Sequence, residues 1–329
     1  MNYISRQVIQ EAREKHTDMI KKMSKAMLGI CFFFVIIITP EFIFLKKILG
    51  TVYMPVMLIL GIVQILLVFL TPYIVGFFAF RKTEGGLNSI RLNRFAKKYK
   101  KLFFLKSTEI ASDRYLSYLC SVIPAEKNKF NRFSLLCSKM YAHIARLEVE
   151  NAYQTLQELE RTFDPKVHYQ LDFVYAKLSY AMQFCSYDEF KRLCDDNPAL
   201  YKDSLRKYES ILGYASLNVH DLRQTGRYME AIDQLDSFLD FMKLDLDPAN
   251  VLEPKKLNNK IYTYAHLLLD KAAMYFAAGD RDKCLDYVNE SDKYTQMITC
   301  ELPPLFLKDH KDIMMMLYPR EEKQSQPLD

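Results

Sequence analysis

The stretch from residue 26 to residue 80 constrains this chain more than any other feature, because it is apolar almost without a break. It divides into two segments, residues 26–45 and 52–80. A helix needs roughly 20 apolar residues to cross a hydrocarbon core of about 30 Å, and both segments reach that length. Backbone polar groups in lipid must be satisfied within the segment, so we expect two transmembrane helices joined by a tight turn. A cleaved signal peptide fits less well, since the first segment is too long and a second span follows at once.

Basic residues flank this stretch and predict its orientation, since Lys and Arg mark the cytoplasmic ends of spans. Residues 1–26 carry a net charge of +3 and residues 81–106 a net charge of +8, whereas the turn holds only Lys46 and Lys47. We therefore expect an integral protein of a bacterial inner membrane with both termini in the cytoplasm. Residues 107–329 have a net charge of −7, which argues against a nucleic-acid partner.

The basic juxtamembrane segment, residues 81–106, has a helical period of its own. A basic amphipathic helix beside a span suits the headgroup layer of an anionic leaflet. The residues expected to contact anionic membrane lipid are Arg91, Arg94, Phe95, Lys97, Lys98, Lys100, Lys101 and Phe103. Alternatively, the apolar stripe of this segment packs on the soluble domain, and the lysines only fix the orientation of the transmembrane helices. The sequence leaves both interpretations open. Residues 1–25 show a weaker amphipathic pattern and are also expected to form a helix.

From residue 107 onward the apolar positions recur at intervals of three and four residues, and no segment alternates as a strand does. Glycine is scarce, with 9 residues in the whole chain. We therefore predict an all-α fold: an N-terminal transmembrane hairpin followed by a cytoplasmic α-solenoid of irregular helix-turn-helix repeats. The helical-repeat domain is placed at residues 107–318, and a disordered tail is expected at residues 319–329.

The clearest repeat runs from residue 267 to residue 294. Ala272 and Tyr275 precede a turn at Gly279, and Cys284 follows that turn by five positions. This resembles a tetratricopeptide repeat, in which a small residue and a Tyr precede a Gly turn and a small residue follows it. Small residues let two antiparallel helices approach closely, and Gly gives the connection its backbone freedom.

Three further units match less closely. In residues 215–239, Gly226 stands at the turn and Ala231 follows it, while the two fainter units have Phe190 and Ala152 after their turns. The turn-following positions are 38, 41 and 53 residues apart instead of the family's 34, which puts a uniform superhelix in doubt. The residues expected to form the repeat packing are Ala152, Phe190, Gly226, Ala231, Ala272, Tyr275, Gly279 and Cys284.

Common catalytic and cofactor motifs are missing from the sequence, which contains no GxxxxGK[ST], HExxH or GxSxG. The 6 histidines lack a metal-ligating spacing, and the 7 cysteines include no CxxC pair. Glu41 and Gln64 are polar residues in or near the spans, where interfacial and helix-packing roles compete with an ion role. We expect no catalytic residue, no cofactor and no metal.

The resemblance to tetratricopeptide repeats implies protein binding, because such solenoids hold a partner segment in a concave groove. A packed helical domain without an open groove is the alternative. We therefore predict a non-catalytic, membrane-anchored adaptor or scaffold, and a homo-oligomer formed through the hairpin stays open. Two other functions also stay open: a subunit of a membrane transport or secretion complex, and an enzyme with an unrecognised site.

Overall fold

The chain was analysed as a computed structural model. It describes residues 94–109, 111–165, 167–168, 170–201, 208–243, 246 and 257–319, with Gln7, Val8, Glu11, Glu14, Lys25 and Arg91 as isolated positions. Both predicted transmembrane helices lie outside the described residues, as do most of the predicted N-terminal helix and tail. Within the described part, no helix has both the length and the apolar character needed to cross a membrane. The chain divides into two compact units, residues 11–95 and residues 1–10 with 96–329. The second is called the helical unit below.

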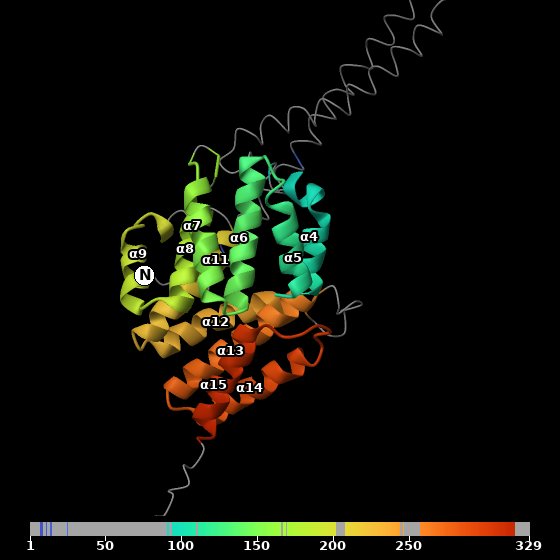
Figure 1. Ribbon diagram of the computed structural model, residues 1–329. Coiled ribbons are helices and arrows are strands. Elements are labelled where there is room, and N and C mark those ends of the chain that lie inside the picture. Colours follow the sequence, from blue (N-terminus) through green and yellow to red (C-terminus); the bar gives the residue numbers. More distant parts are fainter. Residues whose placement is uncertain are drawn as a thin grey trace, which may run out of the picture. The chain divides into compact units, whose positions relative to one another are not determined.

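The all-α prediction is confirmed for the described residues, among which no strand occurs (Figure 1). The helices are α4 (Lys100–Thr108), α5 (Asp113–Val122), α6 (Lys129–Ala145), α7 (Val149–Thr162), α8 (Gln170–Phe184), α9 (Tyr187–Asp195), α11 (Tyr208–Gln224), α12 (Tyr228–Lys243), α13 (Asn258–Ala277), α14 (Arg281–Thr295) and α15 (Pro304–Leu317).

Successive helices pack as hairpins: α6 with α7, α8 with α9, α11 with α12, and α13 with α14. Three of these hairpins share one turn geometry, in which Leu147, Gly226 and Gly279 have positive φ angles of 59°, 74° and 89°. In each turn the next backbone N–H donates to the carbonyl five residues earlier, which satisfies an orphan carbonyl at the helix end. These pairs are Glu148 to His143, Arg227 to Leu222 and Asp280 to Tyr275, at 3.0, 2.8 and 2.9 Å.

The hairpins also contact one another in chain order, through α7 with α8, α8 with α11, and α12 with α13. In Figure 1, helices α4 to α9 stand side by side, and α12 to α15 lie below them. Two contacts connect distant parts of the chain, α4 with α13 and α6 with α15. At the first of these, the Asn258 side-chain amide donates to the Thr108 carbonyl over 2.8 Å. A strictly linear stack would have contacts between neighbouring repeats only.

Helix α4 belongs to the helical unit by its packing, although the sequence places the start of the repeat domain at residue 107. It contacts α5 and α13, and Leu102 and Leu105 are 2% and 0% exposed. Burying a leucine contributes about 1.5–3 kcal/mol of apolar transfer free energy. A fragment that begins at residue 107 would lose both of these side chains.

Candidate functional site

Five of the eight residues predicted to form the repeat packing are fully buried, while Gly226 and Gly279 lie in exposed turns. Ala152, Phe190, Ala231, Ala272 and Cys284 are each 0% exposed. Three of them follow a left-handed turn residue by five positions, where the second helix of a hairpin first crosses the first. A longer side chain at these positions would separate the two helices.

Tyr275 differs from these residues because it is only partly buried. Its ring stacks on Tyr287 of α14, with the centroids 5.4 Å apart and the planes 3° from parallel. The Lys271 and Lys283 ammonium groups lie 5.8 and 5.0 Å from its centroid. Tyr275 therefore joins the two helices through its ring face and keeps one edge toward solvent.

The residues predicted to contact the membrane differ in exposure, and those up to Lys98 precede the turn at Tyr99 that leads into α4. Phe95 is 4% exposed, and Tyr99, its neighbour on the same side, is 6% exposed. Phe103 is 45% exposed. The other exposed members of the predicted set are Arg94, Lys97, Lys98, Lys100 and Lys101, and Arg91 is intermediate. The basic side chains therefore remain in solvent while part of the aromatic stripe is buried.

A buried carboxylate, Glu126, joins this segment to the turn between α5 and α6. Its side chain is 3% exposed and accepts a hydrogen bond from the Lys98 ammonium at 2.5 Å and another from the Tyr99 hydroxyl. It also accepts from the Asn128 backbone N–H at 2.8 Å and the Asn131 amide at 3.1 Å. Burial alone would raise the pKa of Glu126, but these donors outweigh it and lower the pKa to about 2.

The side chain of Tyr141 on α6 is exposed to solvent, although the protein around its hydroxyl group excludes part of the water. The residue is 39% exposed, yet burial by surrounding protein raises the pKa of its phenol. Tyr175 and Ser179 of α8 lie near enough to influence the pKa of the phenol. Tyr141 therefore presents an exposed aromatic side chain beside α8.

The ring of Tyr175 on α8 lies against α11. A Cβ atom built on Gly213 would lie 3.4 Å from this ring, which is an ordinary van der Waals contact. We refer to Tyr141, Tyr175, Ser179 and Gly213 as the inner surface. These residues come from α6, α8 and α11, the first helices of three successive hairpins.

A polar stripe runs along α13, where Tyr262, His266 and Asp270 follow at intervals of four and share one helix face. The His266 Nε2 atom lies 2.8 Å from the Asp309 carboxylate of α15, and the Tyr262 hydroxyl lies 3.3 Å from Nδ1. Burial would lower the pKa of His266, but the hydrogen bond with Asp309 and the negative charges of Asp270 and Asp309 together outweigh it and raise the pKa. Burial also raises the pKa of Asp270, against the opposing charges of His266 and Arg223.

The pairing of His266 with Asp309 orients an imidazole, as in a catalytic relay. Within the described residues, however, no Ser, Thr or Cys side chain hydrogen-bonds to His266. The same part of the chain contains no group of three or more His, Cys, Asp or Glu side chains that could hold a metal ion. The hydroxyl that does contact this histidine belongs to Tyr262.

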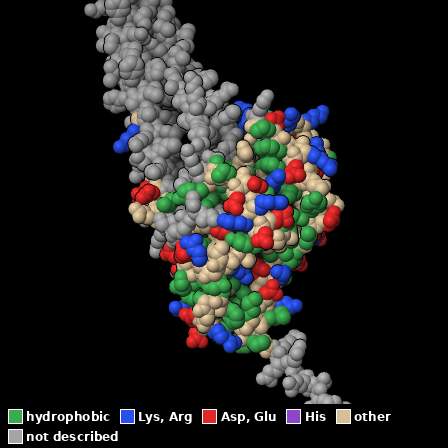
Figure 2. Space-filling model, turned by 90° about the vertical axis from the view of Figure 1, so that its left-hand side faces the viewer, with side chains coloured by type: hydrophobic (Ala, Val, Ile, Leu, Met, Phe, Trp, Pro, Cys, Tyr) green, Lys and Arg blue, Asp and Glu red, His purple; other side chains and the backbone are tan. Residues whose placement is uncertain are grey.

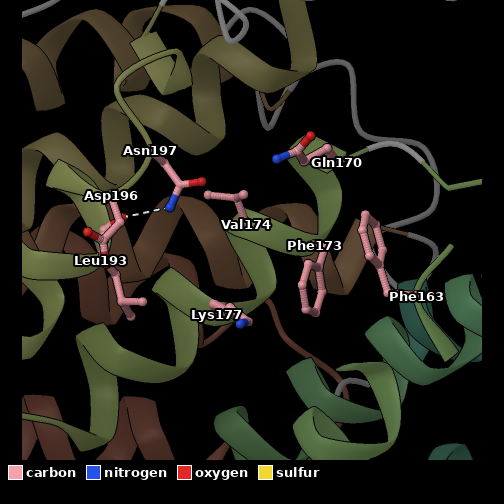
Figure 3. Close-up of a pocket in the computed structure, with 8 residues that line it drawn as sticks. All are labelled: Phe163, Gln170, Phe173, Val174, Lys177, Leu193, Asp196 and Asn197. Atoms are coloured by element: carbon pink, nitrogen blue, oxygen red, sulfur yellow. Dashed lines mark hydrogen bonds between the residues drawn. The ribbon is translucent and has the colours of Figure 1, made fainter. Parts of the chain in front are cut away.

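A pocket of about 250 Å³ lies beside α8, between the end of α7 and the end of α9 (Figure 3). Phe163 and Phe173 stack along it with ring centroids 4.5 Å apart, and the Lys177 ammonium lies 4.8 Å from the Phe173 ring. On the opposite side of the pocket from the two rings, at the end of α9, the Asn197 amide donates to the Leu193 carbonyl over 2.8 Å. Ligand pockets usually measure about 300–1,000 Å³, so this volume suits a single apolar side chain better than a cofactor.

Sequence reasoning missed Glu126, the inner surface and the pairing of His266 with Asp309. Glu126 and the inner surface carry no local signal, because their partners come from other helices. The stripe on α13 does carry one, since Tyr262, His266 and Asp270 interrupt one face of a largely apolar helix at helical spacing.

Comparison with models of protein families, with curated proteins and with solved structures finds no match to this chain. The resemblance to tetratricopeptide repeats therefore rests on the chain's own residues. Figure 2 shows one face of the helical unit, on which acidic and basic side chains are interspersed among apolar ones. This face lacks the continuous basic patch that is typical of a nucleic-acid-binding surface.

Proposed function

We propose that this protein is a membrane-anchored adaptor whose helical unit binds a segment of a partner protein on its inner surface. The observation that carries this proposal is Tyr141, a large aromatic side chain that is 39% exposed on α6, with Tyr175 of α8 nearby. Its position on the first helix of a hairpin agrees with the tetratricopeptide resemblance, in which a concave groove receives the partner.

Tyrosine is suited to this role because its ring offers apolar area while its hydroxyl can hydrogen-bond. Tyrosine is enriched in the buried centres of protein interfaces, where few residues contribute most of the binding energy. A side chain that is already partly dehydrated loses less hydration when a partner covers it. We therefore expect Tyr141 and Tyr175 to be the main contacts for the partner segment.

The membrane anchor in this proposal is supported by the sequence, through the two apolar segments at residues 26–45 and 52–80. The charge asymmetry around them places the helical unit in the cytoplasm, with a bacterial inner membrane as the expected location. A reporter that is active only outside the cytoplasm should be silent when fused after Lys106 or at Asp329. Activity at either fusion point would contradict the hairpin.

Site-specific photo-crosslinking in the full-length protein tests partner binding. A benzophenone amino acid would replace Tyr141 on α6, and Tyr153 on α7 provides the matched control. Tyr153 is also an exposed tyrosine, at 44%, but it belongs to the second helix of the same hairpin. We expect a discrete crosslinked partner from position 141 and none from position 153.

Equal crosslinking from the two positions, or none from position 141, would contradict binding on the inner surface. Crosslinks confined to probes within residues 26–80 would instead favour a subunit of a membrane complex, whose hairpin packs with partner spans. The third alternative, an enzyme with an unrecognised site, has weaker support because no Ser, Thr or Cys side chain hydrogen-bonds to His266 among the described residues.

A further inference from the structure

Helix α4 is apolar on two opposite sides. Leu102 and Leu105 face the core of the helical unit, at 2% and 0% exposure. On the other side, Phe103 and Phe104 are 45% and 51% exposed. Two adjacent large aromatic side chains in water are unfavourable by the hydrophobic effect, and such patches commonly mark an interaction site.

Basic side chains surround the two exposed rings. On a helical projection of α4, Lys100 and Lys101 fall on the same side as Phe104, opposite Leu102, and Lys97 precedes the turn at Tyr99 that leads into α4. All three lysines are exposed, and none of them pairs with a carboxylate of the described residues. We call Lys97, Lys100, Lys101, Phe103 and Phe104 the outer face of α4.

We propose that the outer face of α4 rests on the anionic leaflet of the membrane that holds the chain. This inference deepens the proposed function and rests on its membrane anchor. An exposed aromatic pair among exposed lysines matches a lipid surface, where rings enter the headgroup layer and ammonium groups meet phosphates. Of these lysines, Lys101 also lies 5.1 Å from the centroid of the Tyr118 ring. Phe103 lies 23 residues beyond residue 80, where the second apolar segment ends. An extended chain spans at most about 3.6 Å per residue, so the intervening residues are long enough to place Phe103 at that membrane surface.

This outer face differs from the set that the sequence predicts. Lys98 is engaged by the buried Glu126 carboxylate, and Phe95 is 4% exposed, so neither is available to lipid. Phe104, which the sequence analysis does not single out, joins the set. Lys98 and Tyr99 hydrogen-bond to Glu126 and so hold the residues before α4 to the rest of the helical unit. Contact between the outer face and the leaflet therefore orients the whole unit relative to the membrane.

The absence of Trp from the chain provides a direct test. A single Phe104→Trp substitution gives the full-length protein one tryptophan, whose emission reports contact with lipid after reconstitution into vesicles. Lipids that carry bromine on their acyl chains quench tryptophan on contact. We expect a blue-shifted, strongly quenched emission in vesicles with anionic phosphatidylglycerol, and weak quenching in pure phosphatidylcholine or at high salt. A Tyr318→Trp variant, at an exposed position just after the end of α15, should remain unquenched.

Charge variants test the recognition of the leaflet. In the Phe104→Trp background, replacing Lys97, Lys100 and Lys101 with Gln should weaken the docking equilibrium by roughly fivefold for each lysine removed. Replacing three exposed lysines elsewhere, Lys293, Lys308 and Lys311, removes the same charge and should leave the quenching unchanged.

Failure of the anchor and failure of this inference give different results. A protein that is extracted from vesicles by alkaline carbonate is not membrane-spanning, and the proposed anchor fails. A protein that resists extraction but shows an unquenched tryptophan at position 104 retains the anchor and overturns the inference. Equal quenching in neutral and anionic vesicles also overturns it. An unquenched tryptophan that becomes protected only in native membranes would assign the outer face to a protein partner instead of lipid.

Discussion

Replacing Glu126 with Gln is the sharpest test of how the juxtamembrane segment is joined to the helical unit. The substitution keeps the size of the side chain but removes its charge and turns one acceptor oxygen into a donor. At the position of Oε2 that donor would face the Lys98 ammonium, the Tyr99 hydroxyl and the Asn131 amide, and at the position of Oε1 it would face the Asn128 N–H. The change therefore leaves donors opposed to donors in a site that is nearly inaccessible to water.

The expected loss follows from the pKa of Glu126. The four donors, opposed by burial, shift the pKa from 4.5 to about 2. At about 1.36 kcal/mol per unit, this corresponds to roughly 3 kcal/mol of stabilisation of the charged form. Lys98 is 54% exposed, so solvent screens part of its contribution and about 2 kcal/mol is a better expectation. For a domain of about 200 residues, that loss lowers the melting temperature by about 4–8 °C.

Thermal unfolding of the full-length protein in mild detergent, followed by circular dichroism, would measure this difference. Glu160→Gln provides the control, because Glu160 pairs with Lys177 at 2.6 Å but is 46% exposed. Exposed pairs contribute about 0–1 kcal/mol, so this variant should melt close to the parent. Equal melting temperatures for the two variants would refute the role of Glu126.

The pH dependence of this difference provides a second measurement. Because the folded-state pKa of Glu126 is depressed, its contribution is present above the unfolded value of 4.5 and is lost as the pH falls toward 2. The gap between the parent and Glu126→Gln should therefore shrink between pH 5 and pH 3. A gap that stays constant over this range would show that packing, and not charge, accounts for the effect.

Three further predictions concern the hairpins and the stripe on α13. Ala272→Arg should destabilise the helical unit by several kcal/mol, because the residue is 0% exposed, and an unchanged melting temperature would place this position outside the core. Gly279→Ala and Gly226→Ala should each lower the free energy of unfolding by about 1–2 kcal/mol in thermal melts, because both residues have positive φ. A Cβ atom would meet no other atom within 4 Å at either position, so the expected loss comes from the backbone conformation and not from a clash. The raised pKa of His266 means that its pairing with Asp309 stabilises the fold below the unfolded value of 6.5 and loses that contribution as the pH rises through the folded value. Asp309→Asn should therefore lower stability more at pH 5.5 than at pH 8, as urea titrations at the two pH values can measure.

The helical class and two of the four hairpins could be predicted from the sequence because their signals are local. Gly279 lies between the end of α13 at Ala277 and the start of α14 at Arg281. Gly226 lies in the same way between α11 and α12. In both turns a residue with positive φ is required, and Gly is the residue that adopts it without strain.

The hairpin of α6 and α7 gave a fainter signal for a physical reason. Its turn places Leu147 at a φ of 59°, the left-handed conformation that Gly occupies in the other two turns. A non-glycine residue rarely adopts this conformation, so the sequence offers no marker for the turn. Only the small residue five positions later, Ala152, indicates where the second helix crosses the first.

The candidate binding site could not be predicted because its members come from separate helices. Tyr141, Tyr175 and Gly213 are ordinary helix residues until α6, α8 and α11 bring them together. The same holds for Glu126, whose donors Lys98 and Tyr99 lie 28 and 27 residues earlier in the chain. The periodicity within one helix does not predict which of its residues contact residues of another helix.

The position of α15 has a consequence for the proposed binding mode. Its residues Phe306 and Asp309 lie against the α13 stripe, with the Phe306 and Tyr262 ring centroids 6.0 Å apart and Asp309 2.8 Å from His266. The last helix of the described chain therefore covers the face that α13, as the first helix of its hairpin, would otherwise offer to a partner. A segment bound by this protein would then contact α6 and α8, where Tyr141 remains accessible, and would be shorter than one that spans all four hairpins.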